Sequence, residues 1–169
     1  MVGATGQTGC SSLNIHDPTD GTIGYERESL TSEAFNAVDF VMLNKVLPTD
    51  LEVGATSSGG DFIYHDASYS TFCGKNWGIG NTIGLSTCDA LKANACDTHN
   101  VYLLVDWMAG RPTGDTRKLV CHETGHSIGI PHNDHTGASL DSCMKAQPAT
   151  SSIAGYSSHE VNDMINFVW

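Results

Sequence analysis

The segment Cys121–Asp134, with the sequence CHETGHSIGIPHND, decides the fold that we expect for this chain. Its pattern is H-E-x-x-H-x-x-G-x-x-H, in which His122 and His126 are four residues apart. Two histidines at this spacing lie on one face of a helix, a turn apart, and can bind one metal ion. Gly129 can adopt the left-handed conformation that ends a helix, which lets His132 fold back as a third ligand. Three nitrogen ligands and one open position are what a catalytic zinc site requires.

Glu123 directly follows the first of these histidines, where it can act on a water molecule at the metal rather than on the metal itself. The short pattern H-E-x-x-H also occurs by chance on helices that bind nothing, and Glu123 would then be a solvated carboxylate. The additional glycine and the third histidine make a coincidence much rarer. At these residues the chain resembles the metzincin clan of zinc metalloendopeptidases.

A second part of the metzincin pattern follows downstream. Proteins of this clan carry a methionine in a tight turn beneath the metal, and Met144, in the segment Ser142–Lys145, lies 12 residues after His132. A lone methionine is usually core filler, but in this position it strengthens the resemblance. The residue after the third histidine, Asn133, fits none of the large metzincin families, and the region looks more like small secreted bacterial metzincins.

The resemblance implies an α+β fold, a metzincin-like zincin with a mixed twisted sheet, an N-terminal helix, a metal-binding active-site helix and a C-terminal helix. Because 169 residues is the size of one domain, we expect a single metalloprotease catalytic domain over residues 1–169. In the implied site, a Zn²⁺ ion is bound by His122, His126 and His132. Glu123 is the catalytic base, and Met144 forms an apolar floor.

The activity implied by the resemblance is that of a secreted endopeptidase, in which a zinc-activated water attacks the peptide bond and Glu123 is the general base. An edge strand of the sheet, assigned to Thr82–Thr87, would bind a protein or peptide substrate in extended form. Two alternatives stay open. One is a catalytically silent zinc-binding module on a protease fold, although such a module would not need Glu123. The other is a zinc hydrolase of a non-peptide amide or ester.

The composition limits the partners that we expect for this protein. A formal net charge of −11 disfavours nucleic acid and anionic membrane surfaces as partners, and no apolar run is long enough for a membrane span. We expect a monomer that binds neither. The first nine residues lack the basic segment and apolar core of a signal peptide, so we interpret them as the start of a mature domain.

Six cysteines, at positions 10, 73, 88, 96, 121 and 143, indicate an oxidised, extracellular protein with up to three disulfides. A cysteine-rich metal site is the competing interpretation, but no C-x-x-C pair is present. One pairing can be argued, because Cys121 adjoins the first histidine and Cys143 precedes Met144. A Cys121–Cys143 bridge would tie the metal-binding helix to the segment beneath it.

Hydrophobic periodicity predicts the remaining elements. Strands are expected at Leu13–His16, Thr22–Glu28, Leu51–Ser57, Asp61–His65, Thr82–Thr87 and Val101–Asp106. A first helix opens at Leu30–Glu33 and is closed by Pro48, and its predicted core stripe consists of Phe35, Val38, Val41, Met42 and Val46. The last helix starts at a capping box of Ser157 and Glu160, and its stripe consists of Val161, Met164, Ile165 and Val168.

The metal-binding helix is expected to be capped by Asp115 or Thr116 and to run to about Ile128. Gly125, inside this helix, costs about 1 kcal/mol relative to alanine. A glycine at this position is consistent with tight packing behind the metal.

Other polar residues have simpler interpretations. Tyr156 is interpreted as structural, since metzincins with a tyrosine ligand carry it two residues after the methionine, where this chain has alanine. Asp106 and Asp141 are candidates for structural roles or for roles beside the metal ligands. Asp17 and Asp20 could coordinate a structural Ca²⁺, but a solvated turn is favoured because the EF-hand pattern is missing. Histidines without paired spacing are interpreted as surface residues: His16, His65, His99, His135 and His159.

Overall fold

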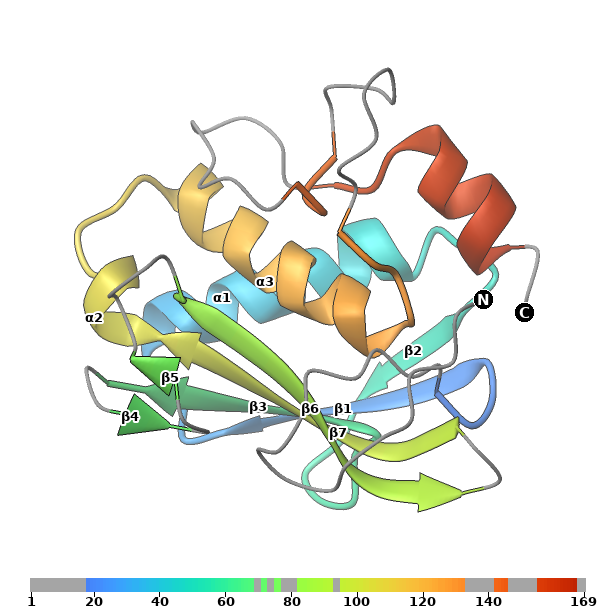
Figure 1. The fold of residues 1–169 in the computed structure, drawn as a ribbon, viewed down its shortest axis with the longest axis horizontal. Coiled ribbons are helices and arrows are strands. Elements are labelled where there is room, and N and C mark those ends of the chain that lie inside the picture. Colours follow the sequence, from blue (N-terminus) through green and yellow to red (C-terminus); the bar gives the residue numbers. More distant parts are fainter. Residues whose placement is uncertain are drawn as a thin grey trace.

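A five-stranded mixed sheet is the centre of the fold, and its strands lie in the order β2-β1-β3-β7-β6 (Figure 1). The computed structural model describes residues 18–68, 71–72, 75–76, 82–92, 95–132, 142–145 and 155–166. The strands of the sheet are β1 (Thr22–Glu28), β2 (Glu52–Ala55), β3 (Phe62–Ala67), β6 (Gly84–Lys92) and β7 (Ala95–Leu104). Two short strands, β4 (Thr71–Phe72) and β5 (Lys75–Asn76), form a separate antiparallel pair.

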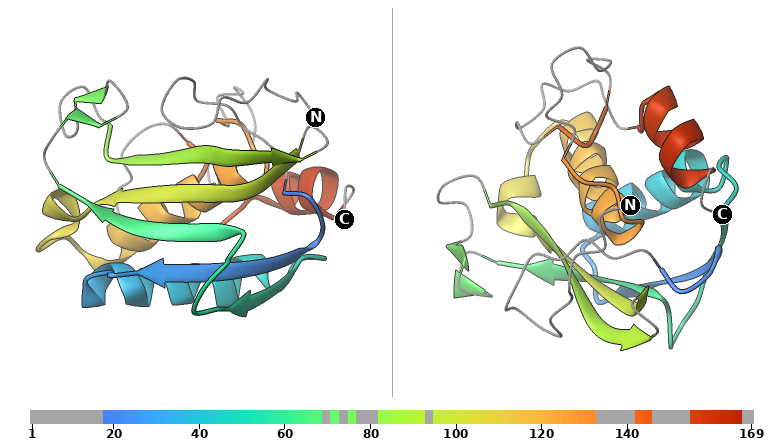
Figure 2. Two further views of the ribbon diagram at one scale, coloured as in Figure 1. Left: turned by 90° about the horizontal axis from the view of Figure 1, so that it is seen from below. Right: turned by 45° about the vertical axis from the view of Figure 1, so that its right-hand side comes forward.

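Most of the sheet is parallel. β1 pairs in parallel with β2 and with β3, and β3 pairs in parallel with β7, whereas β6 pairs with β7 in the antiparallel direction. Parallel neighbours need a crossover connection, and helix α1 (Ser32–Val41) with the π-helical segment η1 (Met42–Val46) connects β1 to β2. Helix α1 and helix α3 (Thr113–Ser127) lie against the same face of the sheet (Figure 2). This arrangement agrees with the expected α+β class.

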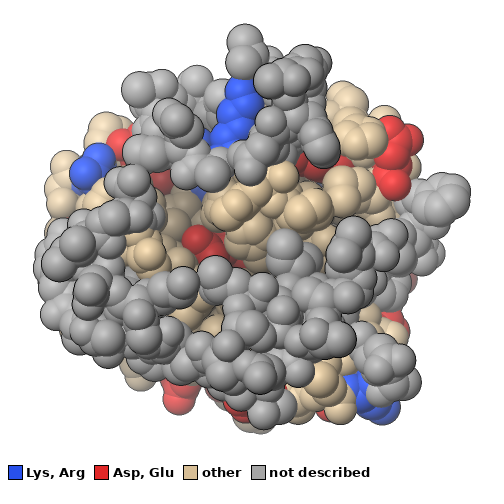
Figure 3. All heavy atoms as spheres, in the orientation of Figure 1, with Lys and Arg blue, Asp and Glu red and all other residues tan. Residues whose placement is uncertain are grey.

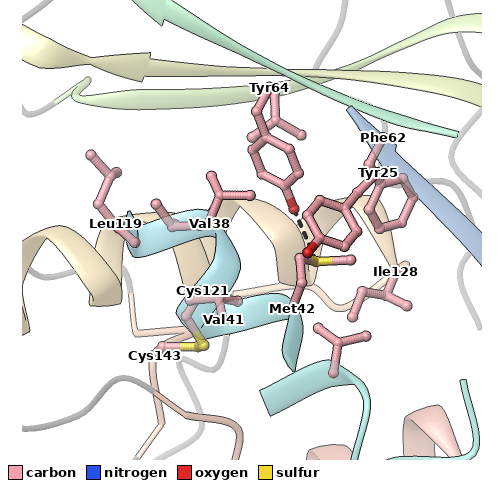
Figure 4. Packing of buried hydrophobic residues seen from close by; sticks show 14 of the residues in the cluster. Tyr25, Val38, Val41, Met42, Phe62, Tyr64, Leu119, Cys121, Ile128 and Cys143 are labelled. Carbon is pink, nitrogen blue, oxygen red and sulfur yellow. Dashed lines mark hydrogen bonds between the residues drawn. A yellow bond between two sulfur atoms is a disulfide. The ribbon is translucent and has the colours of Figure 1, made fainter. Parts of the chain in front are cut away.

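Large side chains on three strands form the side of the core that faces the helices. The register aligns Tyr25 with Phe62 and Tyr64 with Val101, and none of these four side chains is more than 2% exposed. Because successive residues of a strand point to opposite faces, this register places the four side chains in rows beneath the helices. Figure 4 shows Tyr25, Phe62 and Tyr64 reaching from the strands toward Met42 of η1.

Helix α1 begins at a hydroxyl cap, as expected. Thr31 is the N-cap residue, and its Oγ1 accepts a hydrogen bond from Ala34 N at 3.4 Å. The placement of Phe35 in the core is wrong, because this side chain is 39% exposed and its ring lies 4.2 Å from the Arg27 guanidinium. Ala34 takes the buried position beside it. The other members of the predicted stripe are fully buried: Val38, Val41, Met42 and Val46.

The hairpin formed by β6 and β7 is longer than expected. The predicted strand Thr82–Thr87 corresponds to β6, which starts at Gly84 and continues to Lys92. A disulfide between Cys88 and Cys96 joins the two strands. Pairing across the hairpin brings the polar start of β7 into the ladder, although those residues have little preference for a strand.

The end of β7 was also misplaced by the sequence pattern. The predicted strand Val101–Asp106 stops at Leu104, and the residues that follow form the short helix α2 (Val105–Met108). Ala109 N donates a hydrogen bond to Val105 O at 2.9 Å and closes this turn. Asp106 therefore lies in the first turn of a helix rather than in the sheet.

Helix α3 begins earlier than predicted. Asp115 and Thr116, which were expected to cap it, both lie within its first turn, and Asp115 N donates to Pro112 O at 2.9 Å. The cap position is occupied by Pro112, whose side chain makes no capping bond. The proline ring restricts φ to the helical range, here −54°, which allows the helix to begin at the next residue.

The C-terminal helix starts at the predicted capping box. Ser157 N donates to Glu160 Oε2 at 2.6 Å, and Glu160 N donates to Ser157 Oγ at 3.2 Å. The helix continues as the π-helical segment η2 (Glu160–Ile165), in which Ile165 is buried. The predicted helix is therefore confirmed, with a wider turn than an α-helix has.

Charged side chains of the described residues are dispersed among uncharged ones on the face shown in Figure 3. None of the helices in the described ranges combines the length and the apolar character needed to cross a membrane. Some sequence-based predictions concern residues outside these ranges: Cys10, the strand Leu13–His16, Asp17, Cys73, Asn133, His135, Asp141 and Val168.

Candidate metal centre

Helix α3 ends in a turn that reverses the chain after the second histidine. Gly129 has φ of 89°, as its position in the sequence pattern predicted. Gly129 N donates to His126 O at 3.2 Å, and Ile130 N donates to Gly125 O at 2.9 Å. This pair of bonds is the Schellman arrangement, which satisfies the last carbonyls of a helix. The turn leads the chain directly to His132.

Three histidine nitrogen atoms converge at this turn. His126 Nε2 lies 3.2 Å from His122 Nε2, which in turn lies 3.1 Å from His132 Nε2. All three ligand atoms lie within 4.8 Å of one another. Nitrogen ligands of a tetrahedral zinc, each about 2.0–2.1 Å from the metal, are separated by about 3.3 Å. The three side chains could therefore hold one metal ion.

Backbone carbonyls orient the two helical rings. His122 Nδ1 lies 2.8 Å from Cys143 O, and His126 Nδ1 lies 2.8 Å from Ile130 O. A carbonyl only accepts, so each Nδ1 carries the proton and each Nε2 keeps a free lone pair for a metal. Burial lowers the pKa of His122 to about 4 and that of His126 to about 3. Both rings are therefore neutral at physiological pH, as metal ligands must be.

Glu123 is buried next to the histidines. Its side chain is 6% exposed, and burial raises the pKa of its carboxyl to about 8. The edge strand β6 passes directly over it: a Cβ atom at Gly84 would lie 2.6 Å from Glu123 Cδ. Burial with a raised pKa is typical of a carboxyl that exchanges protons during a reaction.

Met144 packs against Gly125 of α3. A Cβ atom at Gly125 would lie 2.9 Å from Met144 Cε, closer still to its sulfur, and 3.1 Å from Tyr156 Cε1. Only glycine at position 125 permits this approach, which explains a glycine inside a helix. Tyr156 also donates from its hydroxyl to Cys121 O at 3.1 Å, a structural contact.

The predicted disulfide between Cys121 and Cys143 is confirmed, with a Cα–Cα distance of 6.0 Å (Figure 4). It ties α3 to the segment that carries Met144. Together with the Cys88–Cys96 bridge, it accounts for every cysteine in the described ranges.

Hydroxyl groups on the side of α3 away from the histidines form hydrogen bonds with the sheet. Thr124 Oγ1 lies 2.8 Å from the hydroxyl of Tyr64, and Ser127 Oγ lies 2.8 Å from Ser86 Oγ. All four side chains are at most 9% exposed. The sequence did not single them out. The available signal was a threonine and a serine on the helix face away from the histidines, where a buried helix normally carries apolar residues.

Of the histidines interpreted as surface residues, one is buried and another is half-buried. His99 is 1% exposed, and its ring meets Phe62 edge to face at 5.2 Å. His65 is half-buried, with Nδ1 2.8 Å from Glu28 Oε2 and Nε2 2.7 Å from Asn100 Oδ1. His65 lies on β3 and His99 on β7, and each of these strands pairs with a neighbour on both sides. His159, in contrast, is exposed as expected.

Asp20 behaves as a turn residue within the described part of the chain. Its Oδ1 accepts a hydrogen bond from Thr22 N at 2.9 Å. This contact is the one expected for a solvated turn.

A comparison of the sequence with protein-family models and with curated proteins finds no match. The structure, however, is similar to the solved structure of myroilysin. The two chains superpose with a TM-score of 0.53 over 91% of this chain and 82% of the other, at 14% sequence identity. They share a fold. At this level of identity, the similarity shows a common fold and does not show a common chemistry.

Proposed function

We propose that this protein is a secreted, zinc-dependent endopeptidase of the metzincin type. The observation that carries the proposal is the convergence of three histidine Nε2 atoms beside a buried carboxyl, that of Glu123. A metal-binding module needs the histidines alone. A buried carboxyl raised in pKa adds a group that can take up and return a proton.

The residues fit a zinc ion by chemistry as well as by spacing. Neutral imidazole nitrogens suit Zn²⁺, and the carbonyls of Cys143 and Ile130 hold two of the rings with Nε2 toward the centre of the triad. When bound, the metal supplies a water with its pKa lowered to about 7 and polarises the carbonyl of the substrate. His132 closes the site from the turn after α3.

Glu123 is proposed as the general base. Its carboxylate takes the proton from the attacking water at a carboxylate oxygen, then delivers that proton to the amine that leaves. Burial beneath β6 raises the pKa of this carboxyl in the metal-free protein, which favours holding the proton between the two transfers, and the positive charge of a bound metal would favour the ionised form that accepts it. Met144 packs against Gly125 of this helix and takes no part in the proposed chemistry.

Strand β6 offers an edge for the substrate. It is the last strand of the sheet, and within the described residues only β7 pairs with it. Leu104 N donates to Ile83 O at 3.0 Å. Ile83 and every second residue after it therefore direct their backbone N–H and C=O groups toward β7. Gly84 and Ser86 then direct N–H and C=O outward. An extended peptide paired with these groups would pass beside Glu123.

The proposed setting is extracellular. Two buried disulfides, Cys88–Cys96 and Cys121–Cys143, persist in oxidising compartments. We propose that one catalytic domain acts as a monomer on protein or peptide substrates, without nucleic acid or membrane as a partner.

Turnover of quenched-fluorescence peptides by the purified, zinc-loaded protein tests this function. A chelator should abolish cleavage, and Zn²⁺ should restore it. Glu123→Gln keeps the shape of the side chain and should lower kcat by about 10²–10⁴-fold, with zinc content unchanged by elemental analysis. Glu52→Gln, at an exposed position on the far edge strand β2, is the matched control and should retain full activity.

Each other outcome contradicts the proposal in a distinct way. Full activity of Glu123→Gln would remove the proposed base. Zinc binding without any turnover would identify a silent module, and cleavage of esters but of no peptide would identify a different hydrolase.

A further inference from the structure

Glu160, at the start of η2, is a buried carboxylate with more partners than a helix cap requires. It is 1% exposed. A capping box explains its bond with Ser157 N, at 2.6 Å. Both carboxylate oxygens also accept from Ser142 Oγ, at 2.7 and 2.6 Å. A buried carboxylate is tolerated when donors surround it, and one of its donors comes from the turn that carries Met144.

Ser142 also forms a hydrogen bond with the backbone of the turn. Its hydroxyl has one proton, which is directed to Glu160, and its lone pairs remain free to accept. Met144 N donates to Ser142 Oγ at 3.0 Å. The hydroxyl therefore links the carboxylate to the main chain two residues further on.

Cys143, between these two residues, has both backbone groups engaged. Its N–H donates to Gly155 O at 2.8 Å, and its carbonyl accepts from His122 Nδ1 at 2.8 Å. The direction of that carbonyl depends on the peptide plane between Cys143 and Met144. The Met144 N–H lies in the same plane and is held by Ser142. The disulfide to Cys121 holds Cys143 against α3, and the hydrogen bond to Ser142 adds a restraint on the direction of this peptide.

We propose that Glu160 is a positioning residue of the metal centre. Through Ser142 it orients the peptide whose carbonyl holds the ring of His122. This inference rests on the proposed metal site. The C-terminal helix lies beside the turn in Figure 1 and Figure 2. By this inference it helps to orient His122, a proposed ligand far from it in sequence.

Two serine variants separate this role from capping. Ser142→Ala removes the link to the turn and leaves the capping box, whereas Ser157→Ala removes the Ser157 hydroxyl that accepts from Glu160 N and leaves the link. Both serines are buried, at 0% and 5% exposed, so the two changes disturb the packing alike. Glu160→Gln keeps the shape of the carboxylate and replaces an acceptor oxygen with a donor.

The readout is the dissociation constant of Zn²⁺, measured by chelator competition, together with the visible spectrum of the Co²⁺-loaded protein. Ser142→Ala and Glu160→Gln should weaken zinc binding by about 10–100-fold, as loss of a group that supports a ligand does, and should change the cobalt spectrum. Ser157→Ala should stay within about twofold of the wild type, on the same reasoning. Circular dichroism and thermal unfolding show which variants are folded.

Equal zinc affinity of wild type and folded Ser142→Ala would overturn the inference and leave the proposed function standing. An equal loss in Ser142→Ala and Ser157→Ala would also overturn it, since capping alone would then account for the effect. A wild-type protein that binds no Zn²⁺ would overturn the metal site and this inference with it.

Discussion

Gly84 of the edge strand lies against Glu123 of helix α3 so closely that a Cβ atom at position 84 would be 2.6 Å from Glu123 Cδ. Two segments far apart in the sequence thus enclose the proposed base. Gly84→Ala should displace this carboxyl and lower kcat by about 10²-fold, the effect of misplacing a catalytic group by an ångström. Steady-state kinetics would measure the loss. Zinc affinity should stay unchanged, because no proposed ligand is touched.

The matched control for that variant is Gly54→Ala, another strand glycine, where an added Cβ would meet nothing within 4 Å. It should keep wild-type kinetics. Undiminished activity of Gly84→Ala would show that the carboxyl can move aside without cost.

Gly125→Ala sets two effects of opposite sign against each other. Alanine favours a helix by about 1 kcal/mol over glycine. The added methyl group would collide with Met144 and Tyr156, and overpacking of this kind costs about 1–3 kcal/mol. We expect net destabilisation, measured as a lower free energy of unfolding in urea. In a double-mutant cycle with Met144→Ala, the cost of Gly125→Ala should shrink; strictly additive costs would contradict the contact.

The two disulfides should differ in what they control. Loss of either bridge should destabilise the protein by about 3 kcal/mol on a chain-entropy estimate, since they close loops with sequence separations of 22 and 8 residues. The pair Cys121→Ser and Cys143→Ser should also weaken zinc binding, because Cys143 O holds His122. The pair Cys88→Ser and Cys96→Ser, in the hairpin, should leave it unchanged. Chelator competition on both double variants measures the contrast, and equal affinities would refute it.

The metal-free protein should be most stable near neutral pH. Burial lowers the pKa of His122 to about 4 and of His126 to about 3, from 6.5. The unfolded chain then binds more protons at these residues, so their contribution is complete above pH 6.5 and is lost as the pH falls through the folded-state values. Glu123 has the opposite sign: its pKa rises from 4.5 to about 8, so stability falls as the pH rises through that range.

Below about pH 6.5 the two histidines outweigh the single carboxyl, and above it only the carboxyl acts, which predicts a maximum near pH 6.5. Urea titrations in the presence of a chelator, at a series of pH values, would measure the curve. Glu123→Gln should lose the decline on the alkaline side and keep the decline on the acid side. A decline above pH 6.5 that persists in this variant would contradict the assignment to Glu123.

Much of the candidate site was predicted from the spacing of residues close together in the sequence. The α-helical period brings His122 and His126 together wherever the helix lies, and a glycine in the left-handed conformation turns the chain at Gly129. Strand β1 and the capped starts of α1 and η2 also follow from short patterns. The errors at Phe35, at His99 and at the ends of β7 occurred where neighbouring elements decide burial and pairing.

The sequence alone determined the metal-binding pattern and the identity of the base candidate, because these depend on residues close together in the chain. It suggested the Cys121–Cys143 bridge, which the structure then confirmed. Only the tertiary structure decided that Gly84 encloses Glu123, that Gly125 admits Met144, and that Glu160 reaches Ser142. These contacts join segments that meet only when the helices pack on the sheet. Their geometry depends on interatomic distances that no local pattern encodes.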